Sequence, residues 1–131
     1  MIGTTSQHLL CEYWGCEAAL LDDCTGLEAL LRRAAEAAGA TVVSVAFHRL
    51  SPQGVSGVVV LEESHFCIHT WPERGYAAAD FFTCGDCQPE RGHEMLGQAL
   101  GASRVELMHL GRGHGPGWPG IRVARHQATG R

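Results

Sequence analysis

Residues 61–85, LEESHFCIHTWPERGYAAADFFTCG, decide how the middle of the chain folds. Apolar and polar residues alternate across SHFCIHTW (64–71), which is the two-residue period of a β-strand with one buried face. PERG (72–75) is a turn sequence, and YAAADFFTCG (76–85) returns the chain, so an antiparallel hairpin is predicted. One face of its first strand is predicted to carry four side chains: His65, Cys67, His69 and Trp71.

The hairpin lies among further strands and two helices. Four other segments read as strands: 8–14, 41–50, 55–63 and 103–110. Two segments read as helices: 25–40 and 89–101. Thr25 and Glu28 fit a capping box at the start of the first helix, and Gly39 is placed to end it. Pro89 suits the first turn of the second helix.

The order of these elements, β-α-β-β-β-β-α-β, predicts an α+β fold. We expect an antiparallel sheet with two helices packed on one face, a two-layer α/β sandwich. Residues 1–112 form one predicted domain, because a chain of 131 residues usually folds around a single core. Residues 113–131 are rich in Gly, Pro and Arg and are predicted to be a flexible tail.

Composition narrows the class of protein. Hydrophobic residues make up 45% of the chain and charged residues 18%, as in a globular protein. The formal net charge of −4 gives no basic surface, so we expect no nucleic-acid partner. No apolar run reaches about 18 residues and the first residues do not resemble a signal peptide. We therefore expect no membrane contact and a cytoplasmic location.

Reactive side chains gather around the predicted hairpin, and three kinds of site compete. His65, Cys67 and His69 point the same way in a strand and could ligate a metal, with Cys84 and Cys87 adding a CxxC pair. The CxxC alone could be a redox pair, but such pairs begin a helix early in a βαβ unit. The chain has six cysteines, and in the reducing cytoplasm that we expect they would not form disulfides. Those that bind no metal are expected to be buried thiols or catalytic groups.

The third possibility is covalent chemistry at Ser64. A serine hydroxyl is a weak nucleophile until a base activates it, and His69 could be that base if the strand turns sharply at Ser64. In the alternative interpretation, Ser64 is a polar strand start and His69 is a satisfied, half-buried histidine.

A longer stretch resembles a known family. HRLSPQGVSGVVVLEESHFCIHTWPERGYAAADFFTCG (48–85) is similar to the core signature of the bacterial and archaeal S-adenosylmethionine decarboxylase proenzymes. HLLCEYWGC (8–16) and LGASRVELMHL (100–110) resemble the first and last strands of that family. The resemblance covers residues 6–112.

The resemblance implies that the chain cuts itself between Glu63 and Ser64. The cut would give a β chain of residues 1–63 and an α chain of residues 64–131. Ser64 would become a pyruvoyl group, a covalent, self-generated cofactor that forms a Schiff base with the substrate amine and accepts electrons as CO2 leaves. No metal is implied.

The resemblance also assigns roles to individual residues. Ser56 and His69 match the positions that assist processing, and His69 abstracts the serine α-proton. Cys84 matches the proton donor in decarboxylation, and an ordinary thiol, with a pKa of about 8.5, is mostly protonated at neutral pH. Trp71 and Glu73 resemble pocket residues, with Glu73 suited to ribose hydroxyls.

Leu50 departs from the family pattern. Many members have Phe directly after His-Arg, where its ring holds adenine and the sulfonium, and leucine has no π face. The implied substrate is S-adenosylmethionine, decarboxylated for spermidine and polyamine biosynthesis, with arginine or ornithine as the alternative. A homodimer of processed protomers is implied, with the active site near its interface. A non-enzymatic alternative is an unprocessed regulatory homologue.

Overall fold

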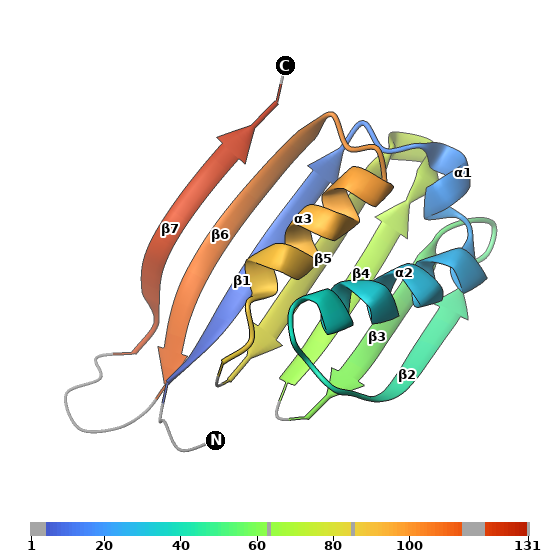
Figure 1. The fold of residues 1–131 in the computed structure, drawn as a ribbon. Helices are drawn as coiled ribbons and strands as arrows, with labels where there is room; N and C mark the ends of the chain where they lie inside the picture. Colours follow the sequence, from blue (N-terminus) through green and yellow to red (C-terminus); the bar gives the residue numbers. More distant parts are fainter. Residues whose placement is uncertain (1–4, 63, 85, 114–119, 131) are drawn as a thin grey trace.

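The chain folds into one antiparallel sheet with all its described helices on one side (Figure 1). This computed structural model describes residues 5–62, 64–84, 86–113 and 120–130. The sheet order is β2-β3-β4-β5-β1-β6-β7. The strands are β1 (Thr5–Trp14), β2 (Val42–Arg49), β3 (Val55–Leu61), β4 (Ser64–Trp71), β5 (Tyr76–Thr83), β6 (Arg104–Gly113) and β7 (Arg122–Thr129). The helices are α1 (Ala18–Leu21), α2 (Cys24–Ala37), α3 (Pro89–Ala99) and a 3-10 turn, η1 (Pro72–Arg74).

The core lies between the sheet and the layer formed by α2 and α3. Along β4, Phe66 and Ile68 are buried while the residues between them are more exposed, so the predicted alternation is confirmed. The ring of Phe66 stacks on that of Phe81 from β5, with centroids 4.6 Å apart. Leu27 and Leu31 of α2 are buried on the same side. The α+β sandwich predicted from the sequence is therefore confirmed.

The helix ends agree with the sequence in part. Gly39 follows α2 with a φ of +88°, a left-handed conformation that favours glycine, and Pro89 is the first residue of α3, both as predicted. The predicted capping box at Thr25 is wrong, because Thr25 lies inside α2. Asp23 caps this helix instead, and its Oδ1 accepts a hydrogen bond from Gly26 N at 3.0 Å.

The structure differs from the predicted flexible tail. β7 pairs with β6 from Val105↔Thr129 to Gly111↔Arg122. All eight residues of β7 are exposed, so no apolar face holds this strand. Main-chain pairing with β6 holds it, together with the ion pairs of Arg125 with Glu90 and of His126 with Glu106. A strand of this kind leaves no hydrophobic period in the sequence, which is why composition alone suggested a tail. Residues 114–119 of the predicted tail lie outside the described residues.

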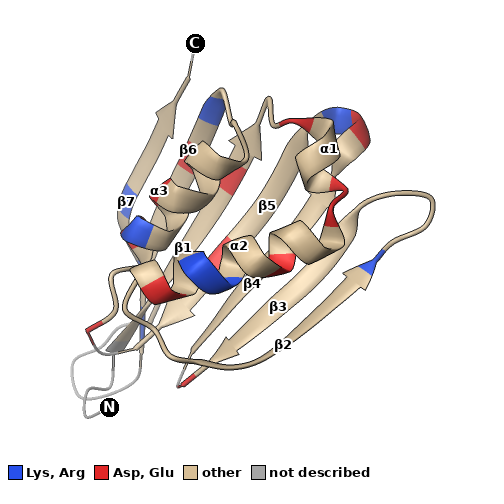
Figure 2. Cartoon of the chain, turned by 45° about the vertical axis from the view of Figure 1, so that its right-hand side comes forward, with Lys and Arg blue, Asp and Glu red and all other residues tan. Residues whose placement is uncertain are grey.

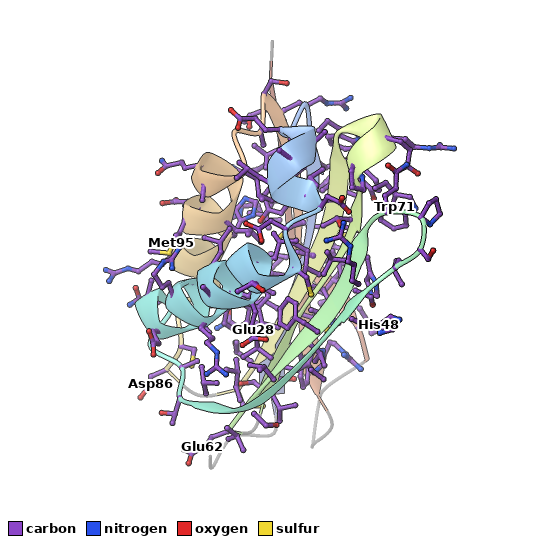
Figure 3. The ribbon with its side chains drawn as sticks, turned by 90° about the vertical axis from the view of Figure 1, so that its right-hand side faces the viewer. Glu28, His48, Glu62, Trp71, Asp86 and Met95 are labelled. Carbon is purple, nitrogen blue, oxygen red and sulfur yellow. The ribbon has the colours of Figure 1, made fainter. Side chains whose placement is uncertain are left out.

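The sheet face opposite the helices is open in the described part of the chain, and we call it the open face (Figure 3). β3 and β4 contain no Lys, Arg, Asp or Glu residue (Figure 2). Val60 and Trp71 are 41% and 39% exposed there. None of the described helices is long and apolar enough to cross a membrane.

Candidate active site

The predicted site residues lie at two opposite ends of the central strands. Ser64 begins β4 and Cys84 directly follows β5, so both lie at one end of the sheet, which we call the Ser64 end. Trp71 closes β4 at the other end. Figure 3 shows Glu62 and Asp86, the neighbours of these two reactive residues in sequence, at the opposite end of the molecule from Trp71.

At the Ser64 end, a hydroxyl and a thiol are close in the sheet. His65 pairs with Phe82 across β4 and β5, so Ser64 and Cys84 stand just beyond the last paired residues. Ser64 Oγ donates a hydrogen bond to the carbonyl oxygen of Glu62 at 3.2 Å. The Cys84 side chain is partly exposed and is not in a disulfide. Glu63, predicted to precede the cut, lies outside the described residues.

The predicted processing pair is assembled towards the other end. Ser56 of β3 and His69 of β4 are cross-strand partners on the open face, and Ser56 Oγ lies 2.9 Å from His69 Nδ1. The pair lines a cavity of about 440 Å³ that also includes His48 and Cys67. The structure thus brings Ser56 and His69 into contact, as a hydroxyl and imidazole that work together require.

The three predicted pocket residues lie at the Trp71 end of the sheet, beyond the Ser56–His69 pair. Leu50 N donates to Gly54 O at 2.8 Å, which closes the turn between β2 and β3, and Leu50 is 38% exposed. Trp71 stacks on Tyr76, with ring centroids 5.1 Å apart. Glu73 lies in η1, next to Trp71 in the chain, and is exposed.

Thr70 holds this end of β4 in place. Its hydroxyl donates to the carbonyl oxygen of Leu21 at 2.7 Å and accepts from the main-chain N–H of Val55 at 2.9 Å. The side chain is only 2% exposed. One buried hydroxyl therefore ties β4 to both α1 and β3, and it fixes the position of the neighbouring His69 and Trp71.

Within one chain, Ser64 and His69 are too far apart to react together. β4 is continuous from Ser64 to Trp71, so the sharp turn that would fold His69 back onto Ser64 is absent. Five residues of strand span about 16 Å, whereas a general base must come within about 3 Å of the proton that it takes. In a single copy, the nucleophile and its predicted base are therefore separated.

The predicted metal ligands are arranged differently from the sequence hypothesis. Among the described residues, the group with metal-compatible spacing is His8, His65 and Asp80, and it does not include Cys67 or His69. The pairing of β1 with β5, which the sequence pattern does not reveal, brings His8 beside Asp80.

Hydrogen bonding at this group opposes a metal. Arg112 Nη1 donates to His8 Nδ1 at 3.1 Å, and a guanidinium only donates, so the proton of neutral His8 is on Nε2. That nitrogen lies 2.7 Å from Asp80 Oδ2 and donates to it, so it has no lone pair for an ion. Burial would raise the pKa of Asp80, but His8 and His65 outweigh burial and lower it.

Three cysteines have pKa values that oppose reactivity. Burial raises the pKa of Cys11 to about 12, and that of Cys16 to about 11. Burial, with a smaller effect from the Asp80 carboxylate, raises the pKa of Cys67 to about 11. Because the thiolate is the nucleophile and the metal ligand, these raised pKa values make the three thiols less reactive near neutral pH than a free cysteine.

A second cavity lies on the helix side of the sheet, away from all these residues. Its volume is about 470 Å³, and it lies between α3, β6 and β7, lined by side chains such as Glu94 and Gln127. It contains none of the predicted site residues.

Comparison with known proteins identifies the family. A model of the family described as S-adenosylmethionine decarboxylase matches residues 7–113. The S-adenosylmethionine decarboxylase proenzyme of Methanococcus maripaludis is 49% identical over 108 residues, which are 82% of this chain and 88% of that protein. Proenzyme 2 of Halalkalibacterium halodurans is 45% identical over 114 residues, or 86% and 90% of the two chains. The crystal structure of the adenosylmethionine decarboxylase from Aquifex aeolicus has a TM-score of 0.80 at 32% identity, and the match covers 88% of this chain and 96% of that one.

The fold and these matches define a decarboxylase of a class whose relatives are named as proenzymes. The chain belongs to the S-adenosylmethionine decarboxylase family, as the resemblance over residues 6–112 predicted. β7 lies beyond the residues that the family model matches.

Proposed function

We propose that the chain is a precursor that cuts itself between Glu63 and Ser64 and then decarboxylates S-adenosylmethionine for polyamine biosynthesis. One observation carries the proposal: Ser64 and Cys84 stand together where β4 begins and β5 ends. The first is the hydroxyl that a self-cut requires and the second is a proton donor. Family membership supports both roles.

The residues of the Ser64 end divide the chemistry between them. Ser64 supplies the oxygen that attacks the preceding peptide carbonyl. A pyruvoyl group derived from Ser64 supplies a carbonyl that accepts electrons when CO2 leaves the substrate. Cys84 then donates its proton to the substrate α-carbon, so the thiol must enter this step protonated.

The active unit that we propose is a homodimer in which the open faces meet. His69 lies about 16 Å from Ser64 of its own chain, so the base that acts at Ser64 comes from a second copy. Two sheets that meet face to face, with the strands of one reversed relative to the other, place the His69 end of each copy over the Ser64 end of its partner. The uncharged strands β3 and β4, with Val60 and Trp71 exposed, suit such an interface.

S-adenosylmethionine is the preferred substrate in this proposal, and arginine or ornithine is the alternative. Leu50 gives no π face for adenine, but the partly exposed ring of Trp71 lies at the same end of the sheet and can supply one. Glu73 follows two residues later and can accept hydrogen bonds from ribose hydroxyls.

Mass spectrometry of the purified protein tests the cut. We expect two pieces, residues 1–63 and residues 64–131 with a modified first residue, and a single piece from Ser64→Ala. An uncut wild-type chain would favour the unprocessed regulatory homologue. Release of CO2 is then compared on S-adenosylmethionine, arginine and ornithine. Release from a basic amino acid alone would reject the proposed substrate.

A further inference from the structure

Four side chains form a row across four strands of the open face, at the Trp71 end of the sheet. In sheet order they are Trp71 of β4, Tyr76 of β5, Trp14 of β1 and Arg104 of β6, and we call them the stacked row. Each is the cross-strand neighbour of the next. Trp71 pairs with Tyr76, the β1–β5 ladder sets Trp14 opposite Tyr76, and Trp14 pairs with Arg104.

The side chains of the stacked row contact one another through their flat faces. The ring of Tyr76 stacks on Trp71, with centroids 5.1 Å apart and planes at 29°, and on Trp14 at 5.9 Å and 27°. The guanidinium of Arg104 lies over the ring of Trp14, 4.4 Å from its centroid. The Tyr76 hydroxyl donates to a carboxylate oxygen of Glu12. Tyr76 is therefore held by a ring on each side and by a hydrogen bond at its tip.

Trp71 ends the row with only one face of its ring covered by it. Tyr76 covers the face towards β5, while Trp71 is 39% exposed and projects from the open face (Figure 3). On the other side, extension of the β3–β4 ladder places Gly54 opposite Trp71, and glycine has no side chain to fill the space. A Cβ at Gly54 would lie 2.8 Å from the carbonyl oxygen of Thr70, so a larger residue does not fit there.

We infer that Tyr76 is a positioning residue for substrate binding, which holds the ring of Trp71 with one face presented to the base of the substrate. This inference rests on the proposed decarboxylation of S-adenosylmethionine, in which Trp71 stacks on adenine. Tyr76 acts through Trp71 and contacts neither Ser64 nor Cys84, which lie at the other end of the same strands.

The benefit of this arrangement is that the ring is ordered before the base arrives. An exposed side chain that rotates freely must be immobilised on binding, which lowers affinity by up to about 10-fold. Because the stack with Tyr76 already restricts the Trp71 ring, this ordering takes place on folding and not on binding. The contact on the base is the same before and during the reaction, so its loss should raise KM and leave kcat unchanged.

Two substitutions at one position test the inference. Tyr76→Leu keeps an apolar side chain and removes the ring, and we expect KM for S-adenosylmethionine to rise about 3-fold to 10-fold with kcat changed less than about 2-fold. Tyr76→Phe is the matched control, since it keeps the ring and loses only the hydroxyl, and its KM should stay within about 2-fold of wild type. Initial rates of CO2 release over a range of substrate concentrations give both constants.

A variant further along the row covers the case in which Tyr76→Leu does not fold. Trp14→Leu removes the ring behind Tyr76 and keeps the contact with Trp71, so KM should rise by less than in Tyr76→Leu. Self-cutting involves no substrate and should be complete in every variant. An unchanged KM in Tyr76→Leu, or in Trp14→Leu if the former does not fold, would overturn the inference, as would equal increases in Tyr76→Leu and Tyr76→Phe. Each of these results leaves the proposed function intact, whereas a wild-type chain that releases no CO2 from S-adenosylmethionine would defeat both.

Discussion

The separation of Ser64 from His69 predicts that a Ser64→Ala chain can restore the cutting of a His69→Ala chain, although neither variant is cut alone. His69→Ala lacks the base and Ser64→Ala lacks the nucleophile, so each is expected to stay uncut alone. In a mixed dimer, the His69→Ala chain keeps Ser64 and receives His69 from its partner. The distance of about 16 Å along β4, against a reach of about 3 Å, leaves no route within one chain.

The expected amount of repair follows from random pairing. If the two variants are unfolded together in equal amounts and refolded, about half of the His69→Ala chains will be in mixed dimers and can be cut. Mass spectrometry counts the pieces from that chain, and the Ser64→Ala chain must stay whole. The matched control replaces the partner with a Ser64→Ala/His69→Ala double variant, which should give no cut. Efficient cutting of His69→Ala by itself, or no cut in the mixture, would refute the reasoning.

Three further outcomes follow from the structure. Thr70→Val should lower the free energy of unfolding by about 2 to 4 kcal/mol, because two buried main-chain groups lose their hydrogen-bond partner. Thr83→Val in uncut protein should cause no such loss, because the buried Thr83 hydroxyl has no partner among the described residues. Denaturant titration measures both. Burial, only partly opposed by nearby glutamates, lowers the pKa of His93. The unfolded chain then binds a proton on His93 more readily than the folded chain does. The contribution of His93 to the free energy of unfolding is therefore fully present above a pH of about 6.5 and is lost as the pH falls towards the folded-state pKa. His93→Gln should flatten this pH dependence in melting curves. Cys67, with a pKa of about 11, should react with iodoacetamide at pH 8 about 100-fold more slowly than free cysteine, as peptide mapping can show; fast labelling would contradict its burial.

Local patterns predicted much of the fold. The alternation in residues 64–71 placed Phe66 and Ile68 in the core and His69 on the open face, because a strand has one periodicity whatever its partners. Gly39 and Pro89 marked helix ends for reasons that lie within one turn of the chain. β7 was missed because all eight of its residues are exposed, so it shows no alternation of buried and exposed positions in the sequence.

The candidate site was less predictable, because it depends on which strands are neighbours. The sequence places His69 five residues after Ser64. The distance between the two side chains is known only from the structure, in which β4 is an unbroken strand from one to the other. No sequence pattern marks Asp80 as a partner of His8, because their contact depends on the pairing of β1 with β5.

The order of the strands also governs what a cut after residue 63 does to the molecule. β1 belongs to the first piece, yet it lies between β5 and β6 of the second, and β3 pairs with β4 across the same divide. Three pairs of hydrogen-bonded strands join the two pieces, so neither piece can dissociate while the sheet stays folded. If the chain cuts itself as proposed, two separate pieces would have to meet again after unfolding, and Ser64, converted to a pyruvoyl group, could not repeat the cut.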